Sequence, residues 1–228
     1  MAQILQAWLK PAAIVGILCL QLPVQAQLVP GYPDDVKAYD PREVALVPPY
    51  CKYTQDFREK IPGGGDRQQM ENWQAVLGPM YIHLHHYCWG LMKANRGMLM
   101  ARTELARYHY LNDAVREYDY VIERSPQDFV LLPEILARKG QVLVRLGKGP
   151  SAIVSFERAI EIKPDYWPPY AYASDYYKEL GEIGQARELL ERGLVGAPNT
   201  SALQRRLNEL GSAPVAHKGT KPSSARTE

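Results

Sequence analysis

The side chains most able to do chemistry lie in one run, His83-Leu84-His85-His86-Tyr87-Cys88, with a second cysteine upstream at Cys51. Imidazole and thiolate groups are good ligands for zinc and copper. On a helix, His85 and Cys88 stand at positions i and i+3, as do His83 and His86, so either pair shares a face. One hypothesis is therefore a metal-binding or redox module centred on Cys51, His85, His86 and Cys88.

No other part of the sequence resembles a catalytic site. The Gly-x-Ser-x-Gly turn of a serine hydrolase and the Cys-x-x-Cys-His motif of haem attachment are both absent. The run Gly63-Gly64-Gly65-Asp66 lacks the Lys and Ser/Thr of a phosphate-binding loop, which favours a hinge. The sequence therefore predicts a protein that is not an enzyme and carries no cofactor.

Residues 1–26 have the features of a secretory signal peptide. Lys10 precedes a short apolar run at residues 11–22, and Val24-Gln25-Ala26 offers small residues where signal peptidase cuts, before Gln27. The run is shorter than the roughly 20 apolar residues that span a bilayer, although an uncleaved anchor is the alternative. We therefore expect export to the periplasm of a Gram-negative cell, with no transmembrane span in the mature chain.

Cleavage would leave Cys51 and Cys88 as the two cysteines of the mature chain. Oxidising compartments favour disulfides, and metal sites normally bring a second ligand pair at regular spacing, which this sequence lacks. A disulfide between Cys51 and Cys88 is therefore the favoured interpretation. It would close a loop of about 38 residues and stabilise the fold by on the order of 3–4 kcal/mol.

The elements that would position these groups begin with a Pro-rich stretch at residues 27–66. Asp66 is a candidate N-cap for a helix that Gly78-Pro79 ends. A second helix should start near Met80, with Leu84, Cys88 and Leu91 on its packed face. We therefore predict that residues 27–94 form a Pro-rich segment followed by an N-terminal helical cap.

From residue 95 the sequence repeats itself at spacings of 38 and 34 residues. Four positions recur in register three times: Ala114, Ala152 and Ala186; Tyr118, Phe156 and Leu190; Val121, Ala159 and Gly193; Pro126, Pro164 and Pro198. This pattern resembles the tetratricopeptide repeat (TPR), a 34-residue helix–turn–helix unit. The middle unit matches best, with Gly140 at the small position of its first helix, whereas the first unit has Arg102 there.

The resemblance implies an all-α fold, a short TPR-type helical solenoid over residues 95–211. It would contain about three helix–turn–helix units. Leu203, Leu207 and Leu210 on one face predict a capping helix at residues 201–210, and the small, polar and basic residues after it predict a disordered tail at residues 212–228. In such solenoids the first helix of each unit lines a concave, partner-binding wall. The positions that would face a partner are Arg138, Gln141, Arg145, Ala171, Asp175 and Lys178, with Tyr172 and Tyr176 alongside. The family's Lys/Asn clamp for a peptide carboxylate is not reproduced.

The predicted function is a protein–protein adaptor or scaffold in a cell-envelope assembly or secretion process. A net charge of +2 argues against a nucleic-acid partner. A third hypothesis is glycan contact by the Tyr/Trp-rich stretch at residues 166–177, as part of exopolysaccharide export. The sequence leaves the identity of the protein partner open, as well as the oligomeric state, a homo-oligomer included.

Overall fold

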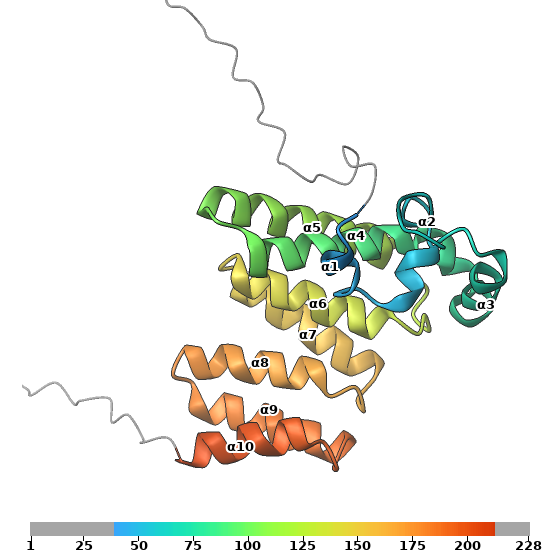
Figure 1. Cartoon of the computed structure of the whole chain (residues 1–228). Coiled ribbons are helices and arrows are strands. Elements are labelled where there is room, and N and C mark those ends of the chain that lie inside the picture. Colours follow the sequence, from blue (N-terminus) through green and yellow to red (C-terminus); the bar gives the residue numbers. More distant parts are fainter. Residues whose placement is uncertain (1–38, 213–228) are drawn as a thin grey trace, which may run out of the picture.

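The computed structural model describes residues 39–212, and within this range it is helical with no strand (Figure 1). The predicted signal peptide, residues 27–38 and the tail beyond Ser212 lie outside the described residues. The elements are α1 (Pro41–Val44), η2 (Pro49–Tyr53), α2 (Phe57–Lys60), α3 (Arg67–Leu77), η3 (Gly78–His83), α4 (Leu84–Asn95), η4 (Arg96–Met100), α5 (Glu104–Arg124), α6 (Leu132–Arg145), α7 (Gly149–Ile162), α8 (Pro168–Glu179), α9 (Ile183–Gly196) and α10 (Ser201–Ser212).

The Pro-rich segment folds into short helical turns. Asp66 caps α3, as expected, because its carboxylate accepts a hydrogen bond from the Gln69 amide at 3.1 Å. Gly78 then takes a left-handed φ of 64° and ends α3. The chain continues through the 3₁₀ turn η3 before α4 begins at Leu84, four residues later than the sequence indicates.

The rest of the described chain stacks antiparallel helix pairs: α4 with α5, α6 with α7 and α8 with α9, closed by α10 (Figure 1). Helix α10 confirms the predicted capping helix. The repeat positions of the second helices are buried in all three pairs, including Tyr118, Phe156 and Leu190. In each pair the repeat proline lies two residues beyond the end of the second helix, where it stops the helix without interrupting it. The repeat pattern therefore correctly predicts which positions of α5, α7 and α9 are buried.

The first pair differs from what the repeat pattern in the sequence predicts. Arg102 lies in the link between η4 and α5, and the small residue of the first helix is Gly90 in α4. A Cβ at Gly90 would lie 2.4 Å from the ring of Tyr118, as one at Gly140 would lie 2.3 Å from the ring of Phe156. The repeat array therefore starts with α4, and the boundary expected between residues 94 and 95 falls inside its first pair.

The first pair is also longer than the others. Gly90 and Tyr118 are 28 residues apart, whereas Gly140 and Phe156 are 16 apart, so the hairpin of α4 and α5 is extended by 12 residues. A fixed repeat spacing cannot locate α4 across such an insertion. This explains why the repeat pattern places Arg102, and not Gly90, at the small position of the first helix. None of the described helices combines the length and the apolar character needed to cross a membrane.

Candidate binding groove on the inner face

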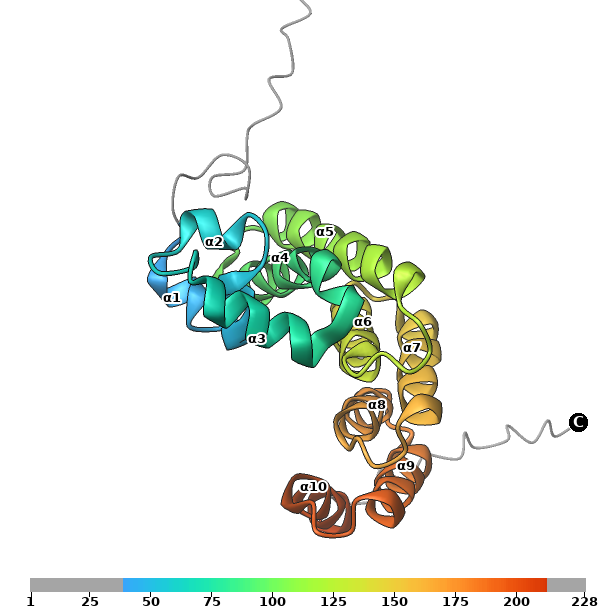
Figure 2. The same cartoon turned by 90° about the vertical axis from the view of Figure 1, so that its right-hand side faces the viewer.

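The stack of helix pairs has two sides. Figure 2 shows α6, α8 and α10 along one side and α5, α7 and α9 along the other. The first helices α6 and α8 and the capping helix α10 therefore form the inner face, as expected for a TPR-type solenoid.

A pocket with a volume of about 140 Å³ opens on this inner face between α6 and α8. Its wall contains five of the residues that the sequence predicts to face a partner: Gln141, Arg145, Tyr172, Asp175 and Tyr176. Met98, Val144, Phe156 and Glu179 complete it. The pocket combines aromatic and apolar surface with charges of both signs, which suits contact with a protein segment.

Two arginines project from the inner face of α6. Arg138 and Arg145 are exposed, seven positions apart, which corresponds to about 10 Å along a helix. Arg145 has no ion-pair partner within residues 39–212, and the guanidinium of Arg138 stands 3.9 Å from the Glu134 carboxylate. The guanidinium of Arg145 is therefore available to acidic or carbonyl groups of a ligand, and that of Arg138 remains exposed beside its Glu134 partner.

The residues of α8 that the sequence predicts to face a partner have different surroundings in the structure. Ala171 is fully buried in the core, so the expectation that it contacts a partner is wrong. Asp175 accepts two-pronged hydrogen bonds at 3.0 Å from Arg206 of α10, and this bond raises the pKa of the guanidinium. Lys178 stands 3.6 Å from Glu209 of the same helix. The capping helix therefore binds charges that the sequence assigned to a partner.

The two predicted tyrosines serve packing as well as the surface. Tyr176 fits over Gly149, where a Cβ would lie 1.9 Å from its hydroxyl oxygen. The ring of Tyr172 lies 6.1 Å from that of Phe156 in the core. Both remain half-buried, so each presents one edge to the groove and uses the rest of its ring between helix pairs.

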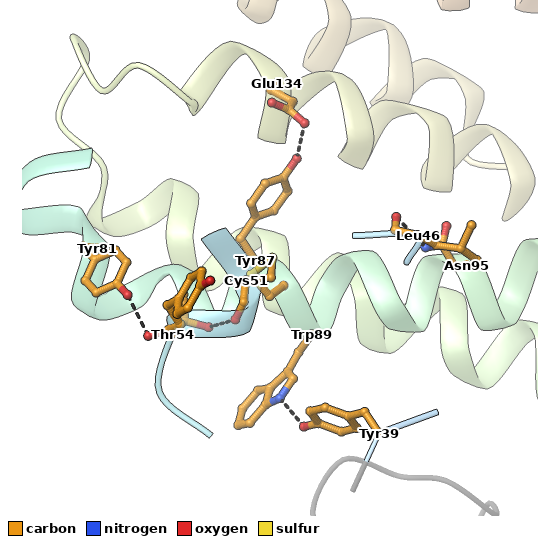
Figure 3. Close-up of a disulfide and its surroundings, with 11 residues drawn as sticks. Tyr39, Leu46, Cys51, Thr54, Tyr81, Tyr87, Trp89, Asn95 and Glu134 are labelled. Atoms are coloured by element: carbon orange, nitrogen blue, oxygen red, sulfur yellow. Dashed lines mark hydrogen bonds between the residues drawn. A yellow bond between two sulfur atoms is a disulfide. The ribbon is translucent and has the colours of Figure 1, made fainter. Parts of the chain in front are cut away.

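Glu134 links the groove to the first pair. Its carboxylate accepts a hydrogen bond at 2.9 Å from the Tyr87 hydroxyl of α4 (Figure 3). Burial raises the pKa of Tyr87 well above its ordinary value, and the negative charge of Glu134 raises it further. Tyr87 therefore stays a neutral donor that fixes the carboxylate beside Arg138.

The N-terminal segment covers α4. In Figure 2, α1, α2 and α3 lie on the side of α4 that faces away from α5. Figure 3 shows three of the hydrogen bonds that join the segment to η3 and α4: Tyr81 to the Tyr53 carbonyl at 2.6 Å, Trp89 to the Tyr39 hydroxyl at 3.1 Å, and Asn95 to the Leu46 carbonyl at 3.4 Å. The inner face of the first pair is therefore occupied by the chain itself, and the open groove begins at α6.

A disulfide fixes this arrangement. Cys51 of η2 and Cys88 of α4 form the bond that the sequence analysis favoured, and both are fully buried. Phe57, also fully buried, packs in the same core cluster. The segment therefore belongs to the core of the first pair.

The disulfide removes both thiolates from the metal-binding hypothesis. The histidines have other partners: His86 makes a 2.6 Å hydrogen bond to Glu117, and His85 contacts the Ile82 carbonyl at 3.0 Å. Burial, together with the neighbouring His86, lowers the pKa of His85 and keeps that ring neutral. Within residues 39–212, no group of three or more His, Cys, Asp or Glu side chains is arranged to hold a metal ion.

The Tyr/Trp-rich stretch does not form a continuous aromatic platform. Tyr170 is buried and donates a hydrogen bond to the Pro164 carbonyl at 3.1 Å. Trp167, Tyr172 and Tyr177 are partly buried against the second core cluster. The stretch therefore acts mainly as packing between helix pairs, and no exposed row of rings supports glycan contact.

Sequence reasoning missed several residues of the groove. Met98 arrives from the extended hairpin, and Arg206 from the capping helix, each from outside the repeat register. Glu134 and Glu179 lie on the first helices, and the helical periodicity of α6 and α8 was a signal that could have found them.

Two curated proteins are similar in sequence to part of this chain. A protein named STIP1 homolog from Dictyostelium discoideum is 30% identical over 98 residues, which cover 43% of this chain and 17% of that protein. Hsp70-Hsp90 organizing protein 2 from Arabidopsis thaliana is 29% identical over 91 residues, covering 40% and 15% respectively. The chain thus spans less than a fifth of the length of these curated relatives. No protein-family model matches the chain.

Among solved structures, the complex titled TPR2B-domain:pHsp70-complex of yeast Sti1 aligns with a TM-score of 0.39 and 21% identity. The alignment covers 53% of this chain and 97% of that one. The buried repeat positions and the stacked helix pairs define the class by themselves: a helical solenoid of helix–turn–helix pairs, whose repeat resembles the TPR.

Proposed function

We propose that the protein is a non-enzymatic adaptor that binds another protein in the groove of α6, α8 and α10. The observation that carries this proposal is the pair Arg138 and Arg145, both exposed on α6, with Arg145 in the wall of the pocket. Exposed arginines flanking aromatic surface are typical of protein-binding sites. One sequence relative carries the name of an organizing protein for Hsp70 and Hsp90, which is consistent with an adaptor role.

The proposed place of action is the periplasm, in an envelope assembly or secretion process. Two observations support it: the signal-like pattern of residues 1–26 and the disulfide between Cys51 and Cys88, a bond that persists in oxidising compartments. Fractionation of cells that express the tagged chain tests this part. Recovery of an oxidised protein in the cytoplasmic fraction would count against it.

Crosslinking in intact cells, followed by mass spectrometry of the captured proteins, tests the binding role. We expect the double reversal Arg138→Glu with Arg145→Glu to abolish capture of a partner that the wild type recovers. The matched control is Arg158→Glu with Arg187→Glu, which makes the same charge change on α7 and α9, outside the groove. Equal capture by both double variants would overturn the assignment of this face.

A further inference from the structure

The extended hairpin of α4 and α5 ends in exposed apolar side chains that the groove does not use. We call Leu99, Met100, Leu105 and Tyr108 the hairpin tip; their exposed fractions are 68%, 42%, 81% and 58%. These residues lie within or beside the 12-residue extension that distinguishes the first pair from the others. Large apolar side chains exposed over one short stretch of a folded chain suit contact with a membrane or a protein.

Contacts at the base of the hairpin fix the position of the tip. Arg96 is buried and donates to the Glu43 carboxylate at 2.5 and 2.8 Å, which fixes the start of the π-helical turn η4. Gly97 lies against Leu111, where a Cβ would meet the side chain at 2.7 Å. Thr103 then caps α5 by accepting a hydrogen bond from the Ala106 amide at 3.1 Å. The base of the hairpin is therefore packed, and its apolar residues stay directed outward.

The surroundings of the tip suit a lipid surface with anionic headgroups. Arg102 is exposed between Met100 and Leu105 and makes no ion pair with any described residue, whereas the exposed Glu104 pairs with Arg107, so these three groups carry a net charge of +1 (two arginines minus one glutamate). Tyr108 stands one helical turn beyond Leu105. Apolar side chains flanked by a cation and a tyrosine are the combination found in segments that lie in the membrane interface.

The described chain begins beside this hairpin. Tyr39 accepts a hydrogen bond from Trp89 of α4, and Glu43 binds Arg96 at the base of the tip. The apolar run of residues 11–22 lies upstream, and the 16 residues from 23 to 38 can span at most about 50 Å. An apolar N-terminal run, when retained, can therefore reach the same surface as the tip.

A second copy of the chain is a poorer occupant. Four side chains exposed to these extents present on the order of 450 Å² of surface, which is about half of the ~800 Å² that each partner of a stable dimer buries. Shallow insertion into a bilayer needs no such area, because each apolar side chain gains by leaving water for the acyl boundary.

We propose that the hairpin tip is a membrane-contact site that inserts Leu99, Met100 and Leu105 into the interface of a bilayer containing anionic lipids. Arg102 contacts the headgroups. None of the tip residues lines the pocket, although Met98 of the same η4 turn does, so the proposal does not rest on the adaptor function.

Hydrogen exchange of the full chain, with and without vesicles, tests the proposal. The vesicles contain phosphatidylcholine with a minor fraction of phosphatidylglycerol. We expect amide exchange in peptides covering residues 97–108 to slow by about tenfold or more when vesicles are added. Peptides covering α9 should not change. Variants of the tip itself distinguish its insertion from vesicle binding by residues 11–22.

Variants sharpen the test. Leu99→Glu with Leu105→Glu should remove the protection, whereas the control Val154→Glu with Val195→Glu, at exposed positions of α7 and α9, should retain it. Arg102→Glu should reduce protection on the anionic vesicles but not on pure phosphatidylcholine. Unchanged exchange at the tip with vesicles would overturn the proposal. Protection of the tip that rises with protein concentration in vesicle-free solution would also overturn it, in favour of contact with a second copy.

Discussion

The first helices of the first two pairs, α4 and α6, each carry a residue that must lack a side chain for its neighbour to fit. Gly90 faces Tyr118 and Gly140 faces Phe156, and in both places a Cβ would come within 2.5 Å of a fully buried ring. These glycines therefore set the distance between the paired helices, and the aromatic ring fills the space that they leave.

Replacing Gly140 by Ala should destabilise the fold by about 1–3 kcal/mol, because the new methyl group overpacks the site of Phe156. Urea denaturation followed by circular dichroism measures the change. The matched control is Gly184→Ala in α9, where a Cβ meets nothing within 4 Å and the expected change is neutral or stabilising by up to about 1 kcal/mol. Equal loss in both variants would contradict the packing argument.

A buried charge network joins α4 to α5. Glu117 accepts 2.6 Å hydrogen bonds from Lys93 and His86. Burial alone would raise the pKa of Glu117, but the hydrogen bonds from His86 and Lys93 outweigh it, and the net pKa is lowered. A carboxyl whose pKa is lower in the folded state stabilises the fold at neutral pH, and that contribution disappears as the pH falls through the folded pKa.

Replacing Glu117 by Gln should therefore cost about 3 kcal/mol at neutral pH, because Lys93 loses its nearest carboxylate in a buried site. The difference between wild type and variant should narrow as the pH falls below about 4.3, the ordinary value for Glu. Unfolding free energies measured from pH 7 to pH 3 check this. Glu123→Gln, exposed on the same helix, should differ little from wild type at any pH; a Glu117→Gln difference that did not vary with pH would contradict the linkage.

Among the elements, the N-terminal segment is the one that could not stand alone. Its helices α1, η2 and α2 have four or five residues each, too few to be stable without packing against α4. The segment contributes Tyr39, Tyr50, Cys51 and Phe57 to the core of the first pair. Its docking therefore depends on the disulfide and on these buried rings.

Replacing Cys51 and Cys88 together by Ala should lower stability by about 3–4 kcal/mol, since the bond closes a loop across a sequence separation of 37 residues. We expect trypsin to cut after Arg58 and Lys60 in the variant far faster than in the wild type. The wild type treated with reductant under unfolding conditions should match the variant. Unchanged cleavage in the variant would show that packing alone holds the segment.

At the scale of the whole molecule, the described chain has two hydrophobic clusters. The first joins the N-terminal segment to α4, α5 and α6, and the second extends from Leu143 to Leu210. Helix α10 closes the second cluster with Leu203, which is fully buried and contacts Gly193 of α9. In a repeat stack each unit contacts only its neighbours, so the loss of a cap acts first on the adjacent pair.

Leu203→Ala should therefore destabilise α8 and α9 by about 2–5 kcal/mol while leaving the first pair protected. Hydrogen exchange resolved by segment checks this. The control Leu180→Ala, at a position that is 56% exposed, should change exchange little. Uniform loss of protection from α4 to α10 would instead indicate a single cooperative unit.

The sequence by itself determined the helical repeat. The four repeat positions recur because the second helix of each pair packs in a similar environment. Few side chains fit each of these positions. The pairing of Cys51 with Cys88 could also be predicted from the sequence. These are the two cysteines that follow the predicted signal peptide, and the expected compartment is oxidising.

Only the tertiary structure decided where the array begins and which inner-face residues are free. Gly90 was hidden because a 12-residue insertion breaks the period without disturbing the packing. Ala171 proved buried and Asp175 proved bound to Arg206, because their surroundings come from helices distant in sequence. A local pattern records what each helix buries against its own partner. Which face is covered by another segment depends on long-range docking, which no fixed spacing encodes.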